Sequence, residues 1–266
     1  MTTNTTKIID THAHYDDTAF DGDRNTLLAS LPDNNIEAVI NVGATVKGAY
    51  DSIELSKKFE HVFAAVGVHP DEVSILTEEE IEIFSAATAY EKIVAIGEIG
   101  LDYHNMGSSK EDQHLWFRRQ LGLARSVHLP AIIHSRDACE DTIKILSEYS
   151  DSLQGCVMHC YSYSAESART FKDMGCMFGI GGVVTFKNAK KLKEVVGSLE
   201  LSDIVLETDC PYLAPEPFRG KRNCSLYLNY VAETIADIKG VSYEEVMSVT
   251  NENTKRLFPR LTDWEI

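Results

Sequence analysis

The sequence predicts an α/β protein folded as a single (β/α)8 barrel of the TIM type, comprising residues 1–266. Three observations lead to this prediction. Short apolar segments alternate with longer amphipathic ones, and eight such units follow one another along the chain. The length of 266 residues is ordinary for one barrel. No G-x-G-x-x-G turn follows the first apolar segment, which argues against a dinucleotide-binding sheet.

The eight predicted strands are nearly continuous runs of Val, Ile, Ala and Cys, as expected of parallel strands buried on both faces. They are Lys7–His14, Ala38–Gly43, Val62–His69, Ile93–Leu101, Ala131–His134, Cys156–Cys160, Cys176–Val184 and Ile204–Thr208. No linker rich in Pro, Gly or Ser divides the chain, so one domain is expected.

Amphipathic helices are predicted between the strands. The clearest is Glu111–Val127, where apolar residues are interleaved with arginines. Ser164–Met174 opens with a serine that can cap the first helical turn. Two more helices, Leu226–Ile238 and Tyr243–Leu257, follow the eighth strand.

Composition narrows the functional classes. The net charge of -16 excludes a general cationic platform for nucleic acid, so an anionic substrate needs local positive charge from metal ions or a small basic loop. Six scattered cysteines without a CxxC pair indicate thiols in a reducing cytosol. No apolar signal core or run of about 20 apolar residues occurs. We therefore expect a cytoplasmic protein without a membrane segment; its oligomeric state is open, and a monomer is compatible with the sequence.

The first strand ends in Asp10-Thr11-His12-Ala13-His14. Side chains alternate along a strand, so both histidines share one face, and they point inward if Ile8 does. Two imidazoles on one face can bind a metal, although an isolated HxH pair is a weak signal.

Other polar side chains also follow apolar strands. They are Glu98 after the fourth strand, His134 after the fifth, His159 after the sixth and Asp209 after the eighth. A barrel brings these strand ends into one ring, where the active sites of the fold lie. Each residue alone could be an ordinary strand-end polar group, but four histidines and two carboxylates at one end favour a shared site.

This set of ligands suits two divalent ions, with one carboxylate free to bridge them. Zn, Mn, Fe or Co would suit the imidazoles, whereas Mg would suit the carboxylates and a phosphate substrate. The residues alone do not choose among these metals.

With these motifs, the chain resembles the TatD-type metal-dependent deoxyribonucleases, within the wider amidohydrolase-like barrels. The resemblance covers nearly the whole chain. Its motifs are DTHAH at 10–14, GVHP at 67–70, GEIGLDY at 97–103, IHSRD at 133–137, HCYS at 159–162 and ETDCPYL at 207–213.

The resemblance implies a (β/α)8 barrel that cleaves DNA, often from the 3′ end, with two divalent metal ions such as Mg, Mn or Zn. By this resemblance His12, His14 and Asp209 would hold one ion, His134 and His159 would hold the other, and Glu98 would bridge the two.

By the same resemblance, GVHP and a basic motif, RGKRN at 219–223, would line the substrate cleft, which makes His69 and Arg222 candidate substrate contacts. The basic loop departs from the family at Cys224-Ser225, where Glu-Pro is common.

Catalysis is expected from Asp209 and Glu98, with Asp209 orienting the attacking water and accepting its proton. His69 and Arg136 are expected to hold phosphate oxygens. Each has a structural alternative: His69 can cap the turn before Pro70, and Arg136 can pair with Asp102 or Asp137. The loop that carries Arg222 can likewise be a solvated surface loop.

Three neighbours of the expected ligands receive roles of their own. Glu207 lies two residues before Asp209 and is expected to orient a ligand or a water. Cys160 and Cys210 each follow a ligand, so alternation points them away from the site, and we interpret both as packing thiols.

Two other functions fit parts of the pattern. The chain could be another amidohydrolase-type enzyme acting on a small ester or amide, but such enzymes often bridge their metals with a modified lysine, and no expected ligand here is lysine. It could also be a non-catalytic metal-binding protein, although a purely structural metal needs no open coordination position.

Overall fold

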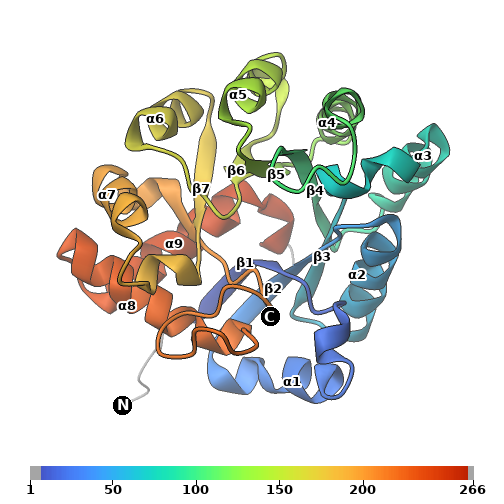
Figure 1. The fold of residues 1–266 in the computed structure, drawn as a ribbon. Helices are drawn as coiled ribbons and strands as arrows, with labels where there is room; N and C mark the ends of the chain where they lie inside the picture. The colour runs from blue at the N-terminus through green and yellow to red at the C-terminus, as the bar shows by residue number, and fades with distance from the viewer. Residues whose placement is uncertain (1–6, 263–266) are drawn as a thin grey trace.

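Eight parallel strands form the centre of the structure, a computed structural model that describes residues 7–262. Each strand pairs with the next one along the chain, in the order β1 to β8 (Figure 1). The strands are β1 (Ile8–Ala13), β2 (Ile36–Val42), β3 (Val62–Val66), β4 (Ile93–Asp102), β5 (Ala131–Arg136), β6 (Cys156–Met158), β7 (Cys176–Ile180) and β8 (Ile204–Leu206).

The ring of strands closes between the last strand and the first. Ala13 and Cys210 form a parallel bridge. The backbone N–H of Asp209 donates to the His12 carbonyl at 2.9 Å, and that of His14 donates to the Cys210 carbonyl at 2.8 Å. The predicted barrel is therefore confirmed, and its seam runs through three residues of the expected site, His12, His14 and Asp209.

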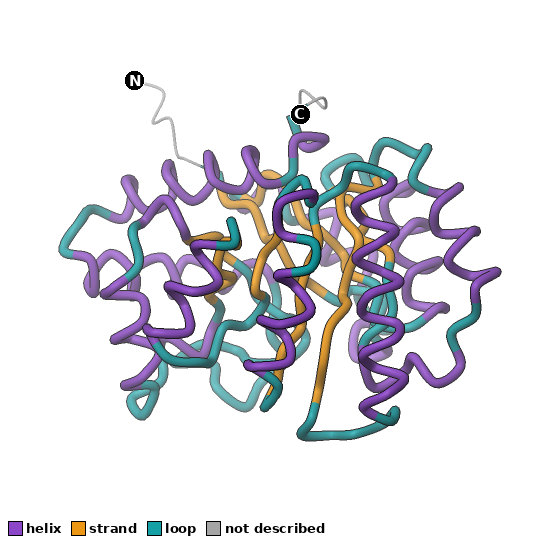
Figure 2. The backbone as a smooth tube through the Cα atoms, turned by 90° about the horizontal axis from the view of Figure 1, so that it is seen from above, coloured by secondary structure: helices purple, strands orange, loops and turns teal. Residues whose placement is uncertain are grey.

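Helices cover the outside of the barrel, as Figure 2 shows for the strands at the centre and the helices around them. They are α1 (Arg24–Ser30), α2 (Val46–Lys58), α3 (Glu78–Ala87), α4 (Lys110–Ser126), α5 (Cys139–Ser147), α6 (Ala165–Asp173), α7 (Lys190–Ser198), α8 (Leu228–Lys239) and α9 (Tyr243–Leu257). Across residues 7–262, none of the helices has both the length and the apolar character that a bilayer span needs.

Two apolar clusters fill the molecule. One takes residues from all eight strands, among them Ile9, Ile132 and Val157, so it occupies the barrel interior. The other joins strand residues to the helices and contains Ile8. The premise that Ile8 points inward was wrong. A register shift between Asp10 and Ala13 breaks the alternation, and this brings His12 and His14 to the site.

Five strands are shorter than predicted, and β3 and β7 end furthest before their predicted ends. β3 ends at Val66, because the chain turns into a 3₁₀ helix (Pro70–Ile75) that His69 caps. β7 ends at Ile180, because a second 3₁₀ helix (Gly182–Thr185) follows at once. The predicted serine cap of α6 is confirmed, since the Ser164 side chain accepts from the Ser167 N–H.

Candidate metal centre

The six side chains expected to bind metal lie together at the carboxyl ends of the strands. Five of them line a cavity of about 450 Å³, namely His14, Glu98, His134, His159 and Asp209. His12 is fully buried beside them, with its ring stacked on that of His159 at 3.5 Å between centroids. The barrel thus brings together residues separated by almost 200 positions in sequence.

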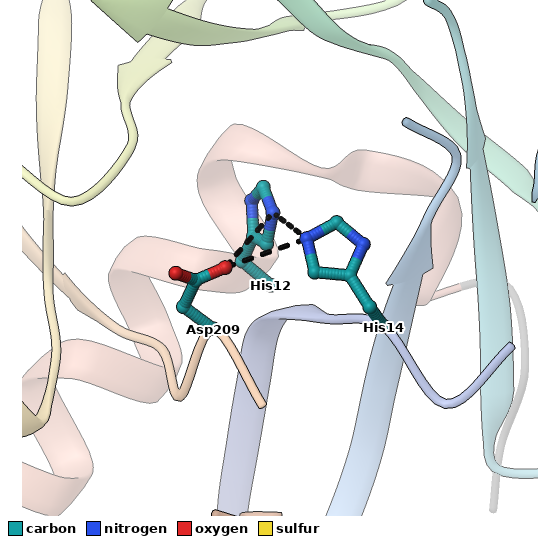
Figure 3. Close-up of side chains that lie close together, drawn as sticks. All are labelled: His12, His14 and Asp209. Carbon is teal, nitrogen blue, oxygen red and sulfur yellow. Dashed lines mark hydrogen bonds and ion pairs between the residues drawn. The ribbon is translucent and has the colours of Figure 1, made fainter. Parts of the chain in front are cut away.

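His12, His14 and Asp209 form the first part of the group, and Figure 3 shows their side chains pointing toward one another. The Nε2 atoms of the two histidines are 3.0 Å apart. Asp209 Oδ1 lies 3.9 Å from His12 Nε2 and 3.4 Å from His14 Nε2. On the other side of the His14 ring, Nδ1 lies 2.9 Å from the Val42 carbonyl, which fixes Nε2 as the nitrogen that faces the cavity.

Glu98 lies between two pairs of histidines, and each carboxylate oxygen faces a different pair. Oε2 lies 3.5 Å from His12 Nε2 and 3.8 Å from His14 Nε2. Oε1 lies 2.7 Å from His134 Nδ1 and 3.8 Å from His159 Nε2. A carboxylate placed in this way can supply one oxygen to each of two neighbouring ions.

Two further carboxylates hold the rings of the second pair. Glu207 Oε2 lies 3.0 Å from Nδ1 of His159, whose Nε2 faces Glu98. Asp102 Oδ2 lies 3.1 Å from Nε2 of His134, whose Nδ1 faces Glu98. A carboxylate on the far ring nitrogen fixes both the orientation and the tautomer of a metal-binding imidazole.

The charges of the group are strongly coupled. Burial alone would raise the pKa of Glu98, but His159, His12 and His134 outweigh it and hold that pKa well below its usual range. Burial lowers the pKa of His159, yet Glu207 and Glu98 raise it to about 9. Without metal, the buried carboxylates are therefore balanced by imidazolium ions.

The donor set fits divalent metal ions. It offers imidazole nitrogens and carboxylate oxygens, the ligands that Zn and Mn take in hydrolases, and the carboxylates also suit Mg. Three groups of side chains at the site keep their ligand atoms within 4.8 Å of one another. They are His12 with His14 and Asp209, His12 with Glu98 and His159, and His69 with Asp102 and His134. The described lining of the cavity contains Glu98 and no lysine.

Two of the expected substrate contacts line the cavity. His69 also has its structural role, because its Nδ1 accepts from the Asp71 N–H at 3.2 Å and caps the turn. Arg136 is exposed, and within residues 7–262 it has no carboxylate within ion-pair distance. Its suggested pairing with Asp102 or Asp137 is thus wrong, and its guanidinium stays available at the cavity.

Arg222, the third expected substrate contact, does not line the cavity of the metal centre. Its guanidinium makes two bonds to the Asp23 carboxylate, at 2.7 and 2.6 Å, and lies over the Phe20 ring. It therefore ties the loop after β8 to the segment before α1. The unusual Ser225 of this loop donates to the buried Asp10 carboxylate at 2.6 Å.

Sequence reasoning missed the roles of Asp10 and Asp102. The buried Asp10 carboxylate accepts from the N–H and the hydroxyl of Thr208, at 3.0 and 2.7 Å, and so locks the barrel seam beside Asp209. No local pattern marks that contact, which joins residues 198 positions apart in the sequence. Asp102 did carry a signal, because it lies four positions after Glu98 and shares its strand face.

Cys160 does not point away from the site, as alternation had predicted. Its Sγ belongs to a group with His159 and Glu207 in which the ligand atoms lie within 4.8 Å of one another. The strand has already ended at Met158, and Cys160 has a φ of 46°, so the alternation rule does not reach it. Cys210 is fully buried in the outer core, and there the prediction of a packing thiol is confirmed.

Comparison with known proteins places these residues in a family context. The sequence matches the family model described as TatD related DNase over residues 9–259. It is 44% identical over 251 residues to the uncharacterized metal-dependent hydrolase YabD of Bacillus subtilis (strain 168), covering 94% of this chain and 98% of that protein. It is 28% identical over 244 residues to the 3'-5' ssDNA/RNA exonuclease TatD of Salmonella typhimurium, covering 90% and 94%.

Solved structures show the same likeness. The crystal structure of YjjV, a TatD homologue from Escherichia coli K12, superposes with a TM-score of 0.88 at 28% identity, covering 96% of this chain and 98% of that one. A TatD family hydrolase from Entamoeba histolytica superposes with a TM-score of 0.86 at 23% identity, covering 95% and 98%, which supports the fold alone.

Proposed function

This chain belongs to the family of TatD-related DNases, which are metal-dependent hydrolases, and from that premise we propose that it is a two-metal phosphodiester hydrolase acting on DNA. Its assignment as an ester-bond hydrolase agrees with the prediction made from the motifs. The DNA substrate, the metal count and the direction of cleavage are the parts that we propose.

The position of Glu98 carries the proposal. One of its oxygens faces His12 and His14, and the other faces His134 and His159. A single metal site would not require a buried carboxylate to present its two oxygens to two separate pairs of imidazoles. This arrangement supports two ions side by side with Glu98 between them.

The remaining ligands divide accordingly. His12, His14 and Asp209 would hold one ion, and His134 with His159 would hold the other. Divalent ions, when bound there, would lower the pKa of a water and neutralise negative charge on phosphoryl oxygens.

The protein contributes orientation and proton transfer. Asp209 is the most accessible of the two central carboxylates, with 18% of its side chain exposed against 5% for Glu98. It therefore faces the space where substrate and water enter. Its histidine neighbours His14 and His159 outweigh burial and lower its pKa, which keeps Asp209 ionised and able to orient the water and accept its proton.

His69 and Arg136 would hold the phosphate. The side chains of both line the cavity, and Arg136 supplies the positive charge that an acidic protein must provide locally. Burial lowers the pKa of His69 to about 4, so its imidazole is neutral and can donate a hydrogen bond through Nε2 while Nδ1 caps the turn.

We propose 3′–5′ exonuclease action on DNA as the specific activity. The Salmonella relative that carries this description for ssDNA and RNA aligns over 94% of its own length. The six residues proposed to bind metal lie together here, which supports metal-dependent chemistry of this kind. RNA cleavage and endonuclease action are alternative outcomes of the test below.

The decisive experiment combines metal analysis with cleavage of oligonucleotides labelled at the 3′ or the 5′ end, in Mg, Mn or Zn. For the wild-type protein we expect about two bound ions per chain and stepwise loss of the 3′ label. The His159→Ala variant should be inactive. Small ester and amide substrates are assayed in parallel. Wild-type protein that cleaves these but no oligonucleotide, or matches His159→Ala on every phosphodiester, contradicts the proposal.

A further inference from the structure

A second, smaller cavity lies beside the metal centre, between β6, β7 and the start of α7. Its volume is about 220 Å³, and its walls come from Cys160, Tyr161, Ser162, Gly179, Gly181, Val183, Asn188, Ala189, Lys191 and Leu192. Figure 1 shows α7 next to β7 on the outer side of the barrel. The mechanism described above gives this cavity no role.

The cavity lies next to the metal centre, although no described residue lines both. Cys160 lines it, and the Sγ of this residue lies within 4.8 Å of ligand atoms of His159 and Glu207. Gly179 lines it too, and a Cβ at Gly179 would overlap the Glu207 carboxylate. The cavity therefore lies beside His159 and Glu207. Cys160 follows the end of β6 and Val183 follows the end of β7, so the cavity is at the same carboxyl ends of the strands as the metal centre.

The chemistry of the two cavities differs. The metal centre is lined by carboxylates that include Glu98, Asp102 and Asp209. The second cavity has no carboxylate among its described lining residues, and Val183, Ala189 and Leu192 give it apolar walls. The exposed Asn188 and Lys191 add a hydrogen-bonding amide and a positive charge.

The different chemistry of the two cavities indicates which part of a nucleotide each one would bind. Charged phosphate is drawn to the metal centre, whereas apolar walls favour a flat, uncharged ring. The cavity is smaller than the roughly 300–1,000 Å³ of sites that bury a whole drug-sized ligand, so one ring system is a better match than a complete nucleotide.

We propose that this cavity is the subsite for the nucleobase of the nucleotide whose phosphate lies at the metal centre. The proposal rests on the proposed function and adds where the base is held. Val183 and Leu192 contact the face of the base, and Asn188 hydrogen-bonds its polar edge, so the subsite contributes affinity without a strong sequence preference.

The test compares two labelled single-stranded oligonucleotides that differ only at the 3′-terminal nucleotide, which carries a base in one and is an abasic tetrahydrofuran unit in the other. Wild-type kcat/KM should favour the base-bearing oligonucleotide by about ten-fold, from the burial of one apolar ring. Val183→Trp and Ala189→Trp, which fill the cavity from two different walls, should each bring this ratio close to one.

Glu194→Trp is the matched control, because Glu194 lies on the same helix, is exposed and does not line the cavity. It should keep the wild-type ratio. Equilibrium binding to the metal-loaded wild-type protein gives a second readout that needs no variant: dAMP should bind about ten-fold more tightly than deoxyribose 5-phosphate.

The two ways to fail can be told apart. Wild-type protein that cleaves both oligonucleotides with equal kcat/KM, or binds dAMP and deoxyribose 5-phosphate equally, overturns the subsite while the proposed function stands. The subsite is also overturned if both tryptophan variants keep the wild-type ratio of kcat/KM between the two oligonucleotides. Absence of cleavage of either oligonucleotide in Mg, Mn and Zn overturns the proposed function, and the subsite with it.

Discussion

Oε2 of Glu207 lies 3.0 Å from Nδ1 of His159, and this contact turns the opposite nitrogen of the ring toward Glu98 and Asp209. The other oxygen of Glu207 accepts from the backbone N–H of Cys160 at 2.6 Å. The carboxylate is nearly fully buried, so it holds the imidazole from behind and stays out of the solvent-filled cavity. Glu207 thus acts on the centre through His159, as the sequence had suggested for a ligand-orienting residue.

Glu207→Gln is expected to weaken metal binding by about 10–100-fold, because a neutral amide no longer fixes the basic tautomer of His159. Metal titration of the purified protein measures this, with the exposed Glu82→Gln on α3 as the control. An affinity equal to that of wild type would show that Glu207 has only a packing role.

Gly179→Ala tests the same contact from the opposite side, because the added methyl group overlaps the Glu207 carboxylate. We expect a loss of about 1–3 kcal/mol in the free energy of unfolding, together with weaker metal binding. The matched control is Gly122→Ala in α4, where a Cβ meets nothing within 4 Å. That change should stabilise the protein by about 0.5–1 kcal/mol. Denaturant unfolding of both variants without metal measures these changes. A Gly179→Ala variant that is as stable as wild type, or more stable, would contradict the predicted overlap with Glu207.

Glu98→Gln should lower phosphodiester turnover at least about 1,000-fold, since the bridging charge and one oxygen ligand are lost while the volume is kept. The amount of bound metal per chain should also fall. Metal analysis and kinetics on the same preparation check both points. A variant that retains the full metal content and loses less than about ten-fold in turnover speaks against a bridging role.

Metal binding at neutral pH should release protons. Burial lowers the pKa values of His14 and His134, but contacts with Asp209 and with Asp102 and Glu98 raise them to about 9 in the metal-free protein. These rings are protonated at pH 7 and must lose the proton to bind metal, so apparent affinity should rise as pH increases toward about 9. Calorimetry in two buffers of different ionisation enthalpy measures the released protons, and identical heats in both buffers would falsify the linkage.

Arg136 and Arg222 form a natural pair for testing the substrate contacts. Arg136→Ala should raise KM for an oligonucleotide about ten-fold or more, because an exposed guanidinium at the cavity is removed. Arg222→Ala should leave KM within about two-fold, since Arg222 is already bonded to Asp23. Steady-state kinetics at low ionic strength separate the two, and the reverse order would return Arg222 to the substrate site.

Local sequence patterns were sufficient to predict the eight strands and several of the helices. α9 has the predicted bounds Tyr243–Leu257, and α4 differs from its predicted range by one residue at each end. This follows because hydrophobic periodicity and caps act over a few residues. The placement of His12, in contrast, came from a wrong premise about Ile8 that a register shift compensated.

The roles that depend on distant contacts could not be read from any local pattern. Cys160 faces His159 and Glu207 only because the chain leaves the strand at Met158 with an unusual backbone angle. Arg222 was expected at the substrate and is instead neutralised by Asp23, almost 200 positions away.

The sequence by itself determined the α/β class, the order of the strands and the six polar residues expected at their ends, because each is encoded in a short apolar run and the polar residues that follow it. Only the tertiary structure decided that Glu98 lies between two pairs of histidines, that Glu207 and Asp102 hold those rings, and that an apolar cavity adjoins them. These features depend on how the barrel closes and on register shifts between strands, which are properties of packing across the whole chain.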